Sequence, residues 1–234
     1  MELHDEKLFE EPPREECPIC MLPLPSANQV TFYSCCGKNV CNGCIHAMAE
    51  TSMEVCPFCK TPPSNSDEEE LQRINKLMER GNAVAFYQLG GYYKDGINGM
   101  PQDQERGNEL WLKAGELGSA DAYFNLGIAY ENGRGVAIDK KKAKHYYELA
   151  AMSGSVIARH NLGIYEYEAG SHQRACKHFI IAARAGSKRT LDAVKDGYMA
   201  RYVTKDEYAN TLREYQKSLD EMKSDARDKA AAED

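Results

Sequence analysis

The hexapeptide AFYQLG at residues 85–90 returns as AYFNLG at 122–127 and as ARHNLG at 158–163, and this recurrence decides the fold of most of the chain. The Leu-Gly pairs stand 37 and 36 residues apart. Each hexapeptide is followed by a second, alanine-rich stretch that ends at Gly-Ser. A period of this length is typical of stacked helix pairs, because each pair buries its apolar face against its neighbours.

The second repeat shows why the pattern needs these residue types. Ala122 and Leu126 lie on one face of the first predicted helix, and Gly127 removes a side chain so that a partner helix can approach closely. Asp139 is the expected N-cap of the second helix, and Gly154 stands where a left-handed C-cap is wanted. The segment is therefore predicted to fold as a helical hairpin.

The motif Gly133-Arg134-Gly135-Val136, followed by Asp139, resembles the Sel1-like repeat family, which is related to tetratricopeptide repeats. The resemblance covers residues 82–187 as three repeats. It implies an all-α solenoid that binds a protein or peptide. Residues 188–222 are expected to form a divergent capping helical repeat, and residues 223–234 a flexible tail that frays.

A pattern of cysteines lies nearer the N-terminus. Eight of the nine cysteines form three CxxC pairs and one vicinal pair: Cys17/Cys20, Cys35/Cys36, Cys41/Cys44 and Cys56/Cys59. Two residues between ligands let both thiolates turn onto one ion, so four pairs are enough for two four-coordinate zinc sites. Such closed sites leave no position for a catalytic water, which makes the zinc structural. The ninth cysteine, Cys176, is expected to be a small buried apolar residue.

The spacing of these pairs, with CPIC at 17–20 and CPFC at 56–59, resembles a RING finger of the all-cysteine C4C4 subclass. The resemblance covers residues 17–60 and implies a small zinc-stabilised α+β domain with two Zn²⁺ ions in a cross-brace. One ion would be held by Cys17, Cys20, Cys41 and Cys44, and the other by Cys35, Cys36, Cys56 and Cys59. Lys38 stands where many RING fingers have a histidine ligand. An alternative is therefore that one of the two adjacent cysteines is a spectator and that His46 completes the site.

A RING finger implies a ubiquitin ligase that docks a ubiquitin-charged conjugating enzyme (E2) and orders its thioester for attack, which is catalysis by positioning. No catalytic side chain is expected in the finger itself. By position, the residues implied to dock the E2 are Ile19, Ile45, Met48, Pro57 and Lys60. The alternative is a non-catalytic zinc-stabilised adaptor or scaffold. A third interpretation, a small-molecule enzyme with active-site cysteines, is disfavoured because closed zinc sites use all eight.

Composition and charge set the remaining limits. The net charge is −7, and residues 1–66 carry nine acidic and four basic side chains, which disfavours nucleic acid as the main partner. No apolar run reaches the roughly 20 residues that span a bilayer. The acidic extension over 1–16 lacks the features of a signal peptide, so a cytoplasmic or nuclear location is expected. Residues 61–81 are predicted to form a turn-rich linker and a leading helix, capped at Ser66.

Overall fold

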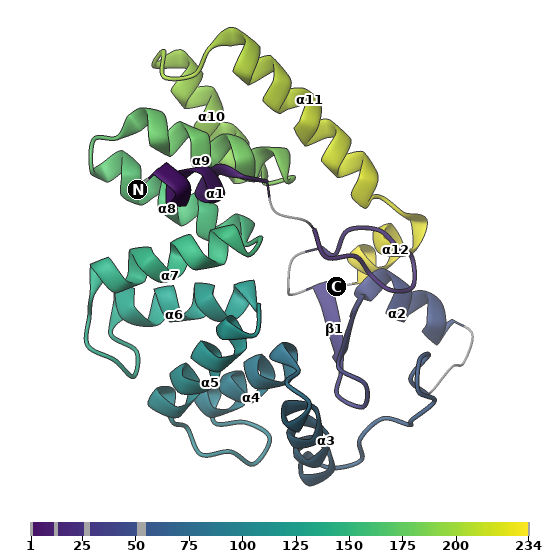
Figure 1. Cartoon of the computed structure of the whole chain (residues 1–234). Coiled ribbons are helices and arrows are strands. Elements are labelled where there is room, and N and C mark those ends of the chain that lie inside the picture. Colours follow the sequence, from purple (N-terminus) through teal and green to yellow (C-terminus); the bar gives the residue numbers. More distant parts are fainter. Residues whose placement is uncertain (1, 12–13, 26–28, 51–54, 234) are drawn as a thin grey trace. The chain divides into compact units, whose positions relative to one another are not determined.

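The computed structural model describes residues 2–11, 14–25, 29–50 and 55–233 (Figure 1). Within these ranges the chain is helical apart from one two-stranded antiparallel hairpin. In chain order the elements are α1 (Glu2–Phe9), β1 (Val30–Tyr33), β2 (Lys38–Cys41), α2 (Asn42–Ala49), α3 (Asp67–Glu79), α4 (Ala83–Asp95), α5 (Gln104–Glu116), α6 (Ala120–Asn132), α7 (Lys140–Met152), α8 (Val156–Glu168), α9 (His172–Arg184), α10 (Lys188–Met199), α11 (Lys205–Met222) and α12 (Asp225–Glu233). None of these helices is long and apolar enough to cross a membrane.

The chain divides into two compact units, and the division falls at three points along the chain, after Pro13, after Leu117 and after Asp220. Unit 1 combines Met1–Pro13 with Gly118–Asp220, and unit 2 combines Arg14–Leu117 with Glu221–Asp234. Unit 1 therefore contains α1 and α6 to α11, whereas unit 2 contains the strands, α2 to α5 and α12. Each unit includes one end of the chain that is remote in sequence from the rest of that unit.

The repeats are helical hairpins in which α4 packs on α5, α6 on α7 and α8 on α9. The first helix of each hairpin is capped by a side chain that accepts the N–H three residues further on. These caps are Asn82, Ser119 and Ser155, with donor–acceptor distances of 2.9, 3.2 and 3.2 Å. The serine of a Gly-Ser turn thus ends one repeat and opens the next. The predicted all-α repeat architecture is confirmed.

The glycine of each Leu-Gly pair marks a close approach of two helices. A Cβ built on Gly127 would lie 2.4 Å from the Tyr147 ring, and one on Gly163 would lie 2.2 Å from the Phe179 ring. Trp111 takes the corresponding place in the first repeat. An aromatic ring of the second helix therefore fills the space that the missing side chain leaves, as the sequence predicts for Gly127.

The helices after the third repeat continue unit 1. α10 packs on α9, and Val194 and Val203 join the apolar cluster of α9. A capping box opens α11, because Glu207 N donates to Thr204 Oγ1 at 3.2 Å and Thr204 N donates to Glu207 Oε2 at 2.8 Å. Cys176 is buried in this cluster, as expected.

The two ends of the chain differ from the sequence-based expectation. The sequence predicts a flexible tail over 223–234, but Asp225–Glu233 forms α12, which packs on α2. Likewise the acidic extension over 1–16 contains α1, whose Leu8 is only 1% exposed. Both helices are short and polar, and helices of this length are marginal in water. Their order comes from tertiary contacts, which no local sequence pattern predicts.

Candidate metal centres

The clustered cysteines lie in a finger, defined here as residues 14–62. Its two outer CxxC turns have the same backbone geometry. Cys17 O accepts from Met21 N, and Cys56 O accepts from Lys60 N, both at 2.9 Å. Met21 and Lys60 have φ of 58° and 59°, in the left-handed region. The same turn thus occurs twice, and each copy places a non-glycine residue at positive φ, which carries a steric cost.

The vicinal cysteines lie between β1 and β2, at the tip of the hairpin. Tyr33 O accepts the N–H of Cys36 at 3.2 Å and that of Gly37 at 2.7 Å, which closes a tight turn. Gly37 has φ of 74°, a conformation that glycine adopts without steric cost. This turn supplies the sharp bend that two adjacent cysteines need to share one site.

The structure gathers the eight cysteines into two groups of four, and within each group the sulfur atoms lie within 4.8 Å of one another. The groups are Cys17, Cys20, Cys41 and Cys44, and Cys35, Cys36, Cys56 and Cys59. The Sγ–Sγ distances are 3.8 Å for Cys17–Cys44, 3.8 Å for Cys20–Cys41 and 3.7 Å for Cys36–Cys56. Four thiolates in a tetrahedron at ~2.3 Å from zinc stand about 3.8 Å apart. Each group could therefore hold a metal ion, and its donors and spacing fit zinc; His46 lies outside both groups.

Burial and neighbouring thiols oppose ionisation of several of these cysteines. Burial, with a hydrogen bond and charge from Cys56, raises the pKa of Cys36 to about 11, and burial likewise raises the pKa of Cys35. Burial also opposes ionisation of Cys17, but N–H groups of the turn outweigh it and lower the Cys17 pKa to about 6. A bound divalent ion would favour the thiolate form of all four sulfurs in a group, because its positive charge offsets theirs.

Arg227 of α12 reaches the first group of cysteines. Its Nη2 donates to Cys20 Sγ at 3.6 Å, and its Nη1 donates to Met222 O at 3.1 Å. Gly43 of α2 permits this approach, because a Cβ there would lie 2.7 Å from the Arg227 backbone nitrogen. A guanidinium beside a metal-bound thiolate offsets part of its negative charge. Sequence reasoning missed Arg227, which lies in no motif.

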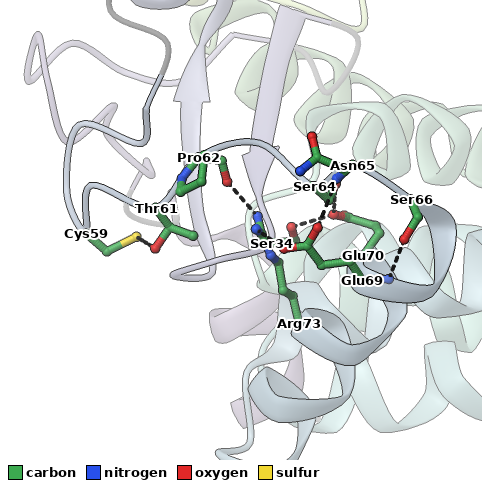
Figure 2. Close-up of polar contacts among 10 residues, drawn as sticks. All are labelled: Ser34, Cys59, Thr61, Pro62, Ser64, Asn65, Ser66, Glu69, Glu70 and Arg73. Carbon is green, nitrogen blue, oxygen red and sulfur yellow. Dashed lines mark hydrogen bonds and ion pairs between the residues drawn. The ribbon is translucent and has the colours of Figure 1, made fainter.

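Polar contacts join the finger to α3 (Figure 2). Glu70 accepts hydrogen bonds from Ser34 Oγ at 2.6 Å and from Ser64 Oγ at 2.9 Å. Arg73 donates from Nη1 to Pro62 O at 3.0 Å. Figure 2 shows that these contacts converge at the start of α3. Because α3 also packs on α4, the segment between the finger and the first repeat contacts both.

The residues predicted to dock a conjugating enzyme come from three parts of the finger. Ile19 and Pro57 lie in the two CxxC turns, Ile45 and Met48 lie on α2, and Lys60 follows the second turn. Ile19 is 39% exposed, Lys60 is exposed and the other three are half-buried. Solvent thus reaches at least part of each, and their role in docking stays a prediction.

The paired helices α4 to α9 form a run of helical repeats. Residues 83–119, 120–155 and 156–187 match the family model of the Sel1 repeat, so the chain contains three Sel1 repeats. No RING family model matches the chain. The prediction of Sel1-like repeats is therefore confirmed, and the assignment of the finger depends on its geometry.

Curated relatives match parts of the chain. A segment of 101 residues is 31% identical to the ERAD-associated E3 ubiquitin-protein ligase component HRD3B of Arabidopsis thaliana, covering 42% of this chain and 15% of that protein. A segment of 51 residues is 47% identical to the E3 ubiquitin-protein ligase GW2 of Oryza sativa subsp. indica, covering 20% of this chain and 11% of that protein. The chain thus spans only a small part of the length of either relative.

Solved structures are similar in fold. The Sel1 repeat protein from Oxalobacter formigenes is 27% identical with a TM-score of 0.50, over 54% of this chain and 98% of that one. The protective antigen c5321 of uropathogenic Escherichia coli, which displays an SLR fold, is 25% identical with a TM-score of 0.52, over 63% of this chain and 33% of that one. Both likenesses agree with the Sel1 repeat assignment.

Proposed function

We propose that the finger is a RING-type domain with two structural Zn²⁺ ions, and that the chain is an E3 ubiquitin ligase. The finger would dock a ubiquitin-charged E2, and the Sel1 repeats would recruit a protein partner. The observation that carries the proposal is the interleaving of the cysteine pairs. The first and third pairs along the chain form one group, and the second and fourth form the other, which is the order that a cross-brace requires.

The chemistry expected of such a finger is positioning. Zinc in a closed four-thiolate site contributes no open coordination position, so the metal holds the fold and the finger presents a surface. Ile19 and Pro57 offer apolar contacts from the two turns, and Lys60 adds a positive charge beside the second turn. Holding a thioester in one orientation accelerates attack on it, because the entropy of alignment is already lost.

The names of the relatives agree with this proposal. HRD3B is named as a ubiquitin ligase component and GW2 as a ubiquitin ligase. The three Sel1 repeats support a role in binding a protein partner, since stacked helical repeats present extended surfaces. A cytoplasmic or nuclear location remains part of the proposal.

An autoubiquitination assay tests the ligase proposal. The full chain, saturated with zinc, is incubated with ubiquitin, its activating enzyme, ATP and a panel of E2 enzymes. We expect ubiquitin chains with at least one E2, and loss of most of that activity in Ile19→Ala and in Lys60→Ala. The matched controls are Ile157→Ala and Lys195→Ala, which remove exposed side chains of the same types from α8 and α10. If the finger variants are as active as the controls, docking through these residues is excluded.

A non-catalytic adaptor is the second candidate, and the packing of α12 on α2 favours it. α2 carries Ile45 and Met48, and part of its surface is covered by Arg227 and its neighbours. Under this alternative the chain binds two zinc ions per molecule yet forms no ubiquitin chains with any E2. Zinc stoichiometry measured on the assay sample therefore separates an adaptor from a misfolded ligase.

A further inference from the structure

A short N-terminal helix docks on the second and third repeats within unit 1. α1 packs against α7 and α9 (Figure 1). Leu8 is 1% exposed and belongs to the same apolar cluster as Tyr147 and Leu162. The helix has eight residues, which is too few for stability in isolation. Its order therefore comes from the surface on which it lies.

A buried arginine binds the end of this helix. Arg159 is 2% exposed and donates from Nη1 to Leu8 O at 2.5 Å and from Nη2 to Glu10 O at 2.6 Å. Carbonyls at a helix C-terminus lack intrahelical partners and carry partial negative charge, which a cation satisfies. Burial lowers the Arg159 pKa to about 10, and the charge of Glu11 opposes that shift. The N-terminal segment supplies the acceptors that a buried guanidinium requires.

The side chain of Phe9 contacts α9. Its ring centroid lies 4.7 Å from that of His178. The Arg174 guanidinium carbon and the Lys177 ammonium lie 5.2 and 5.4 Å from the ring centroid, within the range of cation–π attraction. An aromatic side chain is thus held by one histidine and two cations.

Opposite charges meet at this contact. α9 carries Arg174, Lys177 and Arg184 and no acidic residue, whereas Glu10 and Glu11 follow Phe9 directly. Arg184 Nη1 forms an ion pair with Glu11 Oε1 at 3.2 Å. Backbone carbonyls, one Leu-Phe pair and carboxylates make up the contact, and another peptide with these groups could make the same contacts.

We propose that Tyr147, Arg159, Arg174, Lys177, His178 and Arg184, called here the α1 seat, form the partner-binding site of the repeats. The partner presents an acidic peptide in which a helical turn ends in Leu-Phe and is followed by glutamate. Residues 6–11 of this chain occupy the seat in cis as a built-in competitor. This inference rests on the proposed recruitment role of the repeats and names the class of ligand.

Competition in cis has a measurable consequence. A partner binds only those molecules in which the seat is vacant, so its apparent Kd equals the intrinsic Kd divided by the vacant fraction. Substitutions that release α1 are expected to tighten binding in trans, although they remove contacts from the protein.

The probe is a fluorescein-labelled peptide with the sequence of residues 2–11, ELHDEKLFEE, titrated with the full chain and followed by fluorescence anisotropy. The full-length double variant Leu8→Asp/Phe9→Ala should bind it at least about tenfold more tightly than the original chain. Phe9→Ala alone, which keeps Leu8, should give an intermediate affinity. A peptide with alanine in place of both Leu8 and Phe9 should not bind either protein.

Charge variants made in the Leu8→Asp/Phe9→Ala background test peptide binding without altering the apolar cluster around Tyr147. Lys177→Glu should weaken peptide binding about two- to fivefold, the loss expected for one exposed cation–π contact. Lys195→Glu, the same exchange at an exposed position on α10, should leave it unchanged. Arg184→Glu should weaken binding, and a peptide carrying Glu11→Lys should restore it.

Two results overturn the inference. In one, the double variant keeps its far-UV circular dichroism but binds the peptide no more tightly than the original chain. In the other, it loses helical signal beyond α1, which would make α1 part of the core of unit 1. The titration contains no E2 or ubiquitin. A negative titration with active ubiquitin transfer therefore rejects the inference alone, and a positive one without transfer rejects the ligase alone.

Discussion

The finger and the Sel1 repeats hold their folds by different means. The buried apolar cluster of the finger consists of Cys17, Cys41 and Cys44 with Val40, so its centre is made largely of candidate metal ligands. The second and third repeats instead bury alanines and leucine around Tyr147, with glycines at the helix crossings. The difference teaches that the buried centre of the finger consists of groups suited to a metal ion, whereas the repeats are held by close packing of apolar side chains.

Removal of zinc should produce the largest difference in stability between the finger and the repeats. Structural zinc contributes on the order of 10 kcal/mol to folding in small fingers, so a chelator should unfold the finger and leave unit 1 folded. Hydrogen exchange checks this, with fast exchange expected in β1 and β2 and continued protection in α7 and α9. Equal loss of protection in both regions would show that the repeats also need the metal.

Cysteine variants locate the effect of zinc. Cys36→Ser should lower the zinc content from about two to about one ion per chain, because it removes one of four ligands from a closed site. Cys176→Ser is the matched control and should leave the zinc content unchanged, and so should His46→Ala. Two ions bound by Cys36→Ser would instead make Cys36 the spectator of the vicinal pair.

A substitution by alanine at a helix crossing should have a smaller effect than loss of zinc, and it tests the packing of the repeats. Gly163→Ala places a Cβ 2.2 Å from the Phe179 ring, and overpacking of this kind lowers the free energy of unfolding by about 1–3 kcal/mol. Gly91→Ala is the matched control, since a Cβ there meets no atom within 4 Å and alanine favours a helix by about 1 kcal/mol. Urea unfolding should therefore give changes of opposite sign, and zinc content should not respond to either.

The repeated CxxC turn gives a smaller effect on the finger. Lys60→Gly and Met21→Gly should each stabilise the zinc-bound finger by about 1 kcal/mol, because glycine removes the cost of a left-handed side-chain-bearing residue. Chelator competition measures this as tighter zinc retention. Under the ligase proposal only Lys60→Gly also lowers ubiquitin transfer. Loss of transfer in Met21→Gly as well would point to the turn rather than to the lysine.

The smallest expected effect is a change in the stability of the repeats at acidic pH. Burial lowers the pKa of His160, which packs against Phe179, so the folded state binds its proton less readily than the unfolded state does near pH 6.5. Its contribution to stability is therefore full above the unfolded pKa and is lost as the pH falls below it. The original chain should therefore lose stability relative to His160→Asn as the pH falls from about 7.5 to about 5.5, which urea unfolding at the two pH values measures.

The repeats could be predicted from the sequence because the interactions that form them are local and recur with a fixed period. Leu126, Gly127 and Asp139 reveal a buried face, a close crossing and a cap within one repeat, and the structure confirms each. The CxxC pairs were equally readable, since two intervening residues let both thiols turn onto one ion. The resemblance to a RING finger implied which pairs share an ion. The short inter-helix loop at Ala169-Gly170-Ser171 also follows from the sequence.

What the sequence could not supply depends on contacts between distant segments. α1 and α12 are short polar helices whose order comes from Arg159 in one case and from the surface of α2 in the other. The geometry at Cys35 and Cys36 required the hairpin turn at Gly37, which the cysteine spacing alone does not specify.

The interleaved composition of the two units has a consequence for how the chain is made. Arg227 and Cys20 are 207 positions apart, and Arg159 and Leu8 are 151 apart, so each unit closes with a segment from the opposite end. On the ribosome all eight finger cysteines emerge before Arg227 is synthesised, and α1 emerges long before its seat exists. A cut between 117 and 118 separates each unit from its segment at the opposite end of the chain.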